Sequence, residues 1–443
     1  MIVYTNKITP RLQYIADFIG KEITAKAFEL TDDKIFFESY TGAKLNYSRE
    51  PIADCRLQIA PARMTLSDGD CGLLSENGIK EKDTSCFSVQ GFKAFFKTEG
   101  DYPFDIFAAS FYLLSRYEEY LPYKKDMYGR YAYENSIAFK EGFLNLPLVN
   151  IWINDFKKVL KRKFPQFTIH NSQFTFLPTY DLDEAYSFKH KIFLRTLGGF
   201  TKSFLKGDWS SIKERFYVQS GKSKDPFDSF DWMDELHKKH KLQPMYFFLV
   251  PEKNGKYDKN ILPSIPVMQR LIKQHADKYP IAIHPSWQSG DDDAILKKEK
   301  ELLENISGKK ITASRQHYIR FNLPKGYRRL IDAGITDDYS MGYGSINGFR
   351  ASVASSFYWY DLQKEETTIL RLHPFCYMEA NSFFEQKLTP EQAFDEMIHY
   401  YNAVKSVNGT LITLWHNTFL GTDSFYKGWR EVYKKFIENV VPK

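Results

Sequence analysis

The chain has 443 residues, of which 43% are hydrophobic and 16% aromatic, so it is long enough for about two or three domains with an apolar core. Its 61 basic and 55 acidic residues give a net charge of +6, but they are dispersed, which argues against a nucleic-acid-binding protein. The sequence contains no apolar run long enough to cross a bilayer.

The N-terminus and the cysteines bear on the cellular compartment. Met1–Lys7 lacks a basic segment followed by an apolar run, so we expect no secretory signal and a cytoplasmic protein. Cys55, Cys71, Cys86 and Cys376 form no Cys-x-x-Cys pair. This spacing favours free thiols over a disulfide framework or a cysteine zinc site.

The first third of the chain predicts a small α+β domain without a chemical motif. Its expected elements, in chain order, are a helix over 10–19, strands over 34–38 and 56–60, an amphipathic helix over 103–121 and a helix over 148–160. The Arg116–Glu119 segment is interpreted as a solvated face of its helix. We place a domain boundary near 164–166, which divides the chain into domains at 1–168 and 169–443.

From residue 173 onward, strand-like and helix-like segments alternate, which indicates a mostly parallel sheet with right-handed crossovers. Expected strands cover 174–180, 244–250, 280–283 and 310–313, followed by strands that end at His373 and His416. Expected helices begin near 228, cover 265–275, begin at 291–293 and cover 326–333. The acidic residues at 291–293 are interpreted as a helix cap rather than metal ligands.

Ionisable side chains occur where five of these strands end. They are Asp181, Asp183, His284, His317, His373 and His416. Functional groups of parallel α/β folds gather at the carboxyl ends of strands. Asp181 and Asp183 would point to the same side of their strand, and their mutual repulsion favours a cation between them. Alone, this pair could also be an acidic turn that caps the next helix.

The combination of carboxylates and imidazoles fits hydrolysis. Such a set binds a divalent metal, with zinc the usual ion for nitrogen and oxygen ligands. The metal would activate water, a second carboxylate would accept a proton, and a separate histidine would protonate the leaving group.

The order of these motifs resembles the polysaccharide deacetylase family (NodB-homology fold, carbohydrate esterase family four) over roughly residues 173–430. Thr179–Asp183 resembles the family's opening Thr-Phe-Asp-Asp motif, and Ile281–Ser286 resembles the strand before its metal-binding histidine. Ser314–Tyr318 stands where the Arg-x-Pro-Tyr motif belongs, and Leu411–His416 resembles the last motif. Because it also has an N-terminal domain, the chain resembles a divergent branch of this family that occurs in Bacteroidetes-type bacteria.

The resemblance implies a distorted (β/α) barrel of about seven strands and a smaller N-terminal α+β domain. It implies that Asp181 is the base, that Asp183 and His284 bind the metal, and that His416 is the general acid. The ion would be zinc, with nickel or cobalt as alternatives.

Two departures leave alternatives open. The opening pair is Asp-x-Asp, so Asp181 and Asp183 could exchange roles. The second ligand histidine would fall on Gln288, a poor zinc ligand, so either His317 or water would complete the ligand set, or the site would bind metal weakly or not at all.

The implied activity is removal of acetyl groups from a bacterial glycan or a cytoplasmic glycan precursor. The alternatives are a catalytically impaired glycan-binding relative and a small-molecule amide hydrolase. The oligomeric state is open.

Five residues are candidates for substrate binding, namely Arg315, Tyr318, Trp287, Arg350 and His373. Trp287 would be a platform for a sugar ring. Arg350 either faces the site or forms a structural ion pair. The aromatic run at 357–360 is either core or a stacking surface.

Overall fold

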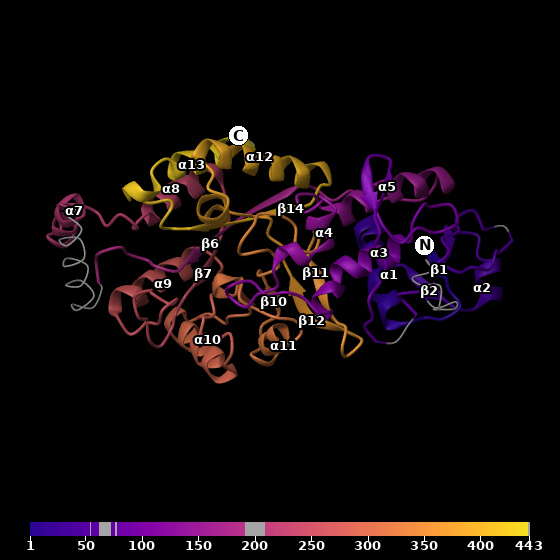
Figure 1. The fold of residues 1–443 in the computed structure, drawn as a ribbon, viewed down its shortest axis with the longest axis horizontal. Helices are drawn as coiled ribbons and strands as arrows, with labels where there is room; N and C mark the ends of the chain where they lie inside the picture. Colours follow the sequence, from indigo (N-terminus) through magenta and orange to yellow (C-terminus); the bar gives the residue numbers. More distant parts are fainter. Residues whose placement is uncertain (54, 62–71, 76–77, 191–208, 442–443) are drawn as a thin grey trace.

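The structure of the chain is a computed structural model that describes residues 1–53, 55–61, 72–75, 78–190 and 209–441. An N-terminal α+β region lies at one end and a large sheet with flanking helices at the other (Figure 1). Cys55, Cys86 and Cys376 are free thiols, as expected, and Cys71 lies outside the described residues.

The N-terminal region contains a three-stranded parallel sheet, a hairpin and helices. Its strands are β1 (Ile2–Tyr4), β2 (Glu29–Thr31), β3 (Lys44–Asn46), β4 (Phe87–Val89) and β5 (Phe92–Ala94). Its helices are α1 (Pro10–Thr24), α2 (Lys34–Ser39), α3 (Ile106–Leu114), α4 (Ile137–Lys140) and α5 (Leu148–Lys163), with short helical turns at Tyr117–Tyr120 and Tyr133–Asn135. The parallel sheet has the order β2-β1-β3.

The sequence predicted α1 and α5 correctly, although both extend beyond the expected ends. The strand expected over 34–38 is wrong, because the Asp33 side chain accepts a hydrogen bond from Phe36 N and caps helix α2. No continuous strand forms within 56–60, where only single bridges at Gln58 and Ile59 occur.

The amphipathic helix expected over 103–121 is also corrected. Asp105 caps α3, all of whose residues are buried, and the helix gives way at Arg116, whose φ of 53° is left-handed. The Arg116–Glu119 segment is buried rather than solvated. Its charges pair within the protein, as described below.

The second region is a nine-stranded sheet with the order β11-β12-β10-β9-β8-β7-β6-β14-β13. Its strands are β6 (Thr175–Leu182), β7 (Met245–Phe248), β8 (Ile281–Ile283), β9 (Ala313–Ser314), β10 (Asp337–Asp338), β11 (Phe357–Asp361), β12 (Glu366–Leu372), β13 (Tyr377–Met378) and β14 (Thr410–His416). Neighbouring strands are parallel, except that β11 runs antiparallel to β12. The predicted mostly parallel α/β sheet is confirmed.

Helices connect and cover these strands. They are α7 (Trp209–Gln219), α8 (Phe230–His240), α9 (Pro266–Lys278), α10 (Asp293–Ser307), α11 (Lys325–Asp332), α12 (Pro390–Ser406) and α13 (Trp429–Val440), with short helical turns at His317–Ile319, Asn381–Glu385 and Ser424–Tyr426. In Figure 1, α12 and α13 lie along one side of the sheet, and α9, α10 and α11 lie along the other. Asp292 accepts from Ala294 N and Ile295 N, so it caps α10 as predicted.

The expected barrel remains a prediction. Among the described residues, no strand pairing joins β11 to β13, the two ends of the sheet. The order β6 to β10 nevertheless brings consecutive strands side by side, so their carboxyl ends share one edge.

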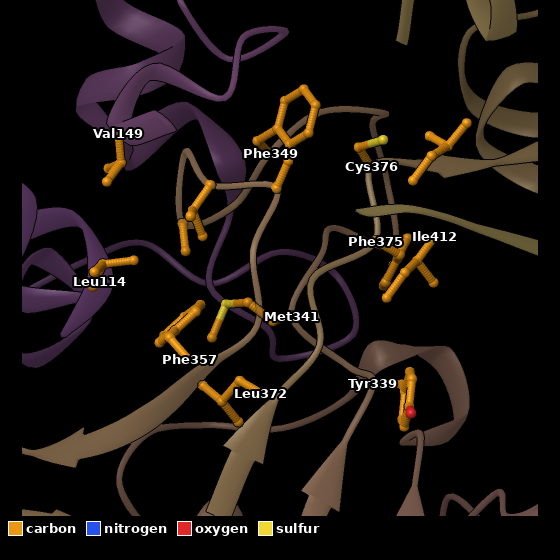
Figure 2. Packing of buried hydrophobic residues seen from close by; sticks show 14 of the residues in the cluster. Leu114, Val149, Tyr339, Met341, Phe349, Phe357, Leu372, Phe375, Cys376 and Ile412 are labelled. Atoms are coloured by element: carbon orange, nitrogen blue, oxygen red, sulfur yellow. The ribbon is translucent and has the colours of Figure 1, made fainter. Parts of the chain in front are cut away.

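One buried apolar cluster extends through both regions. Figure 2 shows Leu114 and Val149, from the N-terminal helices α3 and α5, close to Phe349 and Phe357 of the sheet region. Trp359 of β11 is buried in the same cluster, which places the aromatic run at 357–360 in the core, with Tyr358 exposed. The division into domains at 1–168 and 169–443 therefore stays a prediction. Within the described ranges, no helix is both long and apolar enough to cross a membrane.

Candidate functional site

A cavity of about 520 Å³ lies at the carboxyl ends of the central strands. Its lining includes Asp181, Asp183, His284, His317 and His416. The parallel register of β6 and β14 sets Asp181 opposite His416, so residues that are far apart in sequence meet at this edge. The structure therefore brings together the strand ends that carry these five side chains, but it does not bring His373 to the cavity.

Asp183 lies at the centre of the cluster. Its Oδ1 is 3.1 Å from His284 Nε2, and its Oδ2 is 3.3 Å from His317 Nε2. One ligand atom from each of these three residues lies within 4.8 Å of the others. Among the described residues, Asp183 Oδ1 has no hydrogen-bond partner although it is buried. Such an arrangement can hold a divalent ion.

The ring nitrogens of both histidines are oriented by their outer partners. His284 Nδ1 lies 2.5 Å from the carbonyl oxygen of Arg315, which can only accept, so this nitrogen carries the proton. His317 Nδ1 lies 3.0 Å from Asp258 Oδ1 and donates in the same way. With Nδ1 engaged in this way, each ring directs its Nε2 toward Asp183, and Nε2 is the atom that could bind a metal once it carries no proton.

Asp181 is held by an arginine. Arg315 Nη1 donates to Asp181 Oδ1 at 2.8 Å, and Arg315 Nε donates to the carbonyl of Tyr339 at 3.0 Å. Both charged side chains are buried. The second oxygen of Asp181 is 3.6 Å from His284 Nε2, which leaves it beside the cluster rather than at its centre.

His416 ends β14, which lies on the other side of β6 from the strands that precede His284 and His317. Its Nε2 is 3.4 Å from Asp183 Oδ2, and its Nδ1 is 2.6 Å from Glu379 Oε1. Glu379, which follows β13, is fully buried and also accepts from the backbone nitrogen of His416. The carboxylate therefore fixes both the ring and the strand end that carries it.

Burial and neighbouring charges shift the titration of these groups in opposite directions. Burial lowers the pKa of His317, but Asp183 and Asp258 outweigh it and raise this pKa to about 9. Burial likewise opposes protonation of His416, yet Glu379 and Asp183 hold its pKa well above the ordinary value. Burial raises the pKa of Asp183, but the imidazoles of His317 and His284 bring it well below its usual range.

Two predicted substrate-binding residues lie elsewhere, which corrects the sequence interpretation. Arg350 is buried in a bidentate pair with Glu119, with Nε to Oε1 at 2.9 Å and Nη2 to Oε2 at 2.6 Å. His373 lies between Asp337 and Ser356, at 2.8 Å from each. Neither residue is among the described residues that line the cavity. Arg350 is thus the structural ion pair of the two alternatives.

Trp287 also differs from expectation, and Gln288 is not among the residues that meet at Asp183. Trp287 stacks on Tyr257 with ring centroids 3.9 Å apart, and it is the Tyr257 ring that lines the cavity. Gln288 Nε2 lies 3.4 Å from Asp258 Oδ2, so it contacts the carboxylate behind His317. Tyr318 lines the cavity and stays a predicted substrate-binding residue, whereas Arg315 faces Asp181 from a fully buried position.

Sequence reasoning missed four residues. Glu379 directly follows the two-residue strand β13, and Asp258 lies in the loop beyond β7, but no local spacing indicates their contacts with His416 and His317. Tyr128 and Arg130 come from the N-terminal region and line the cavity. Nothing in the local pattern around them indicates that position.

Comparisons with known proteins give partial similarities. A family of unknown function (DUF7033) matches residues 1–165. No curated protein matches the chain.

Three solved structures illustrate the partial likeness. A protein from Mycobacterium smegmatis assigned as a polysaccharide deacetylase is 14% identical, with a TM-score of 0.40 over 61% of this chain and 85% of that chain. Polysaccharide deacetylase Bc1974 from Bacillus cereus is 9% identical, with a TM-score of 0.31 over 60% of this chain and 88% of that chain. BA3943, a CE4 family pseudoenzyme from Bacillus anthracis, is 10% identical, with a TM-score of 0.31 over 61% of this chain and 62% of that chain. At such values, the chemistry of this chain has to be inferred from its own side chains.

Proposed function

We propose that the chain is a metal-dependent hydrolase that removes acetyl groups from a glycan or a glycan precursor. One observation carries most of the support. Asp183, His284 and His317 converge within 4.8 Å in a cavity that Asp181 and His416 also line. Such a set combines metal ligands with two groups able to transfer protons.

The donor atoms fit a divalent ion such as zinc, with nickel or cobalt as alternatives. Asp183 offers an unbonded buried oxygen, and the two rings offer oriented Nε2 atoms. An ion held there would supply Lewis-acid polarisation of the acetyl carbonyl and lower the pKa of water.

The geometry favours one of the two role assignments for the aspartates. Asp183 faces both Nε2 atoms, as a ligand should, whereas Asp181 has one oxygen bonded to Arg315. In the proposal Asp181 accepts the proton of the attacking water, and Arg315 holds its carboxylate in position. His416, oriented by Glu379, donates a proton to the departing nitrogen or oxygen.

The same geometry favours catalysis over simple glycan binding. The concern from the sequence was that Gln288 replaces a ligand histidine. In the structure His317 faces Asp183 directly, and Gln288 supports its partner Asp258 from behind. The cavity, with mixed aromatic and polar lining, has a size suited to a sugar residue.

Elemental analysis of the purified protein tests the metal site. We expect about one zinc, nickel or cobalt ion per chain in the wild type and its loss in Asp183→Ala. Asp395→Ala, at an exposed helix position, is the control and should retain the ion. Absence of metal from the wild type even after reconstitution would contradict the proposal.

Acetate release from acetylated glycans tests the catalytic roles. Asp181→Asn and His416→Ala should each lower kcat by about 10²–10⁴-fold while the metal is retained. Acetate release that persists in both variants would show that the two roles are assigned wrongly.

A further inference from the structure

Two residues of the cavity wall, Tyr128 and Arg130, come from outside the region that carries the sheet. They belong to the 1–165 segment that matches a family of unknown function. Their presence in the cavity links that segment to the site.

A tight turn fixes these two residues. Asp126 Oδ1 accepts from the backbone nitrogens of Tyr128 and Arg130, both at 2.9 Å, and Gly129 adopts the left-handed φ of 79° that the turn requires. Arg130 Nε donates to Asp126 Oδ2 at 2.6 Å. The turn is therefore held by its own carboxylate and needs no ligand to form.

Arg130 also links this turn to the segment that follows His317. Its Nη1 donates to the carbonyl of Tyr318 at 2.6 Å, and Tyr318 directly follows His317. A Cβ at Gly344 would fall on this same Nη1, so a glycine is needed for the close approach. The guanidinium also lies 4.8 Å from the centre of the Tyr128 ring, which supports the ring from one side.

Three tyrosine rings form the wall that results. The centroid of the Tyr318 ring lies 5.3 Å from that of Tyr128 and 5.3 Å from that of Tyr257, and all three residues line the cavity. Trp287 backs Tyr257 from behind. The His317 and Tyr318 rings are 4.7 Å apart, so the wall begins beside the candidate metal ligand.

We infer that Tyr128, Tyr257 and Tyr318 form a subsite that binds the ring of an acetylated sugar next to the reacting acetyl group, and that the N-terminal region thereby contributes to substrate choice. The inference rests on the proposed function and extends it to residues outside the sheet region. Aromatic faces contact the C–H groups of sugar rings, while phenol hydroxyls bond to sugar hydroxyls. Half-buried rings beside a polar cluster offer both at once.

The test compares a sugar substrate with a small one. The substrates are tetra-N-acetylchitotetraose and p-nitrophenyl acetate, which carries no sugar ring. For the oligosaccharide, Tyr128→Ala should raise KM about 3- to 10-fold with kcat unchanged, because one stacking contact is lost. For the small ester, which has no sugar ring, the rise in KM of the variant should be smaller than for the oligosaccharide, and the metal content should equal that of the wild type.

Two variants in the same turn serve as controls. Met127→Ala removes a side chain that is 86% exposed beside Tyr128, and it should behave like the wild type. Tyr128→Phe keeps the ring and should retain most of the oligosaccharide affinity.

Each other outcome overturns a specific statement. An unchanged KM in Tyr128→Ala would show that the wall is purely structural. A wild type that hydrolyses the ester but neither binds nor cleaves the oligosaccharide would overturn the sugar subsite and leave the hydrolase. A wild type without metal and without activity on either substrate would overturn the proposed function, and the subsite with it.

Discussion

Arg315 Nη1 donates a hydrogen bond of 2.8 Å to Asp181 Oδ1, and neither side chain is more than 2% exposed. The arginine follows β9 and the aspartate is the second-last residue of β6, so the pair joins strands that are not neighbours in the sheet. With one oxygen bonded to Arg315, Asp181 keeps a fixed orientation toward His284. A buried carboxylate of this kind needs its partner both for position and for charge.

Replacement of Arg315 by lysine should lower kcat while the metal stays bound. A lysine keeps the charge but cannot donate to both Asp181 and the Tyr339 carbonyl, so the carboxylate loses its fixed position. We expect a fall in kcat of about 10- to 100-fold, with KM little changed. Steady-state kinetics and elemental analysis check this, and a kcat equal to that of the wild type would contradict the positioning role.

Asp258→Asn should weaken metal binding. Asp258 Oδ1 accepts a hydrogen bond from His317 Nδ1. Loss of this carboxylate lowers the basicity of the ring and leaves the ring orientation less fixed. The expected drop in metal affinity is about 10- to 100-fold, measured by competition with a chelator. The matched comparison is Gln288→Ala, which removes a 3.4 Å contact to the other oxygen of Asp258 and a 3.4 Å contact to the carbonyl of Lys253. If the glutamine variant loses more affinity than Asp258→Asn, Gln288 rather than His317 would complete the ligand set.

The sequence predicted the parts of the site that local pattern encodes. His284 and His416 follow apolar strands, and the ends of parallel strands meet, so their convergence could be anticipated. Their partners were missed because β13 is only two residues long and because Asp258 lies in a turn-rich loop. The contacts of Asp258 and Glu379 depend on tertiary structure that no local spacing carries.

The errors have the same origin. The pattern of residues 34–38 predicted a strand, but the N-cap at Asp33 stabilises a helix there. The Arg116–Glu119 segment looked solvated because its ion-pair partner, Arg350, lies 231 positions from Glu119. A short-range pattern cannot distinguish an exposed charge from one neutralised by a distant part of the chain.

Arg350→Met should destabilise the fold without a direct effect on the cavity. Burial would raise the pKa of Glu119, but Arg350 and Arg116 hold it below the ordinary value, so the pair is ionised. Without the charge of Arg350, only Arg116 still pairs with the buried Glu119 carboxylate. The free energy of unfolding, measured in urea, should therefore fall by about 3 kcal/mol. The double variant Glu119→Gln, Arg350→Met should be less destabilised than the single one. A normal stability together with a raised KM would instead return Arg350 to the substrate site.

Asp338 should make stability depend on pH. Burial raises its pKa from 3.8 to about 6, against hydrogen bonds from Ser340 and Ser314 that lower it. Between these values the folded chain binds more protons than the unfolded chain, so the stabilisation is complete below pH 4 and is lost as the pH rises through about 6. The change is on the order of 2–3 kcal/mol.

Asp338→Asn removes this titration, so the free energy of unfolding of the variant, relative to the wild type, should rise by that amount between pH 4 and pH 7. Urea unfolding at several pH values measures the difference. Asp395→Asn, at an exposed position on α12, is the control and should show a constant difference. If the Asp338→Asn difference were equally constant, Asp338 would titrate alike in the folded and unfolded chains, and burial would not be the force that sets its charge.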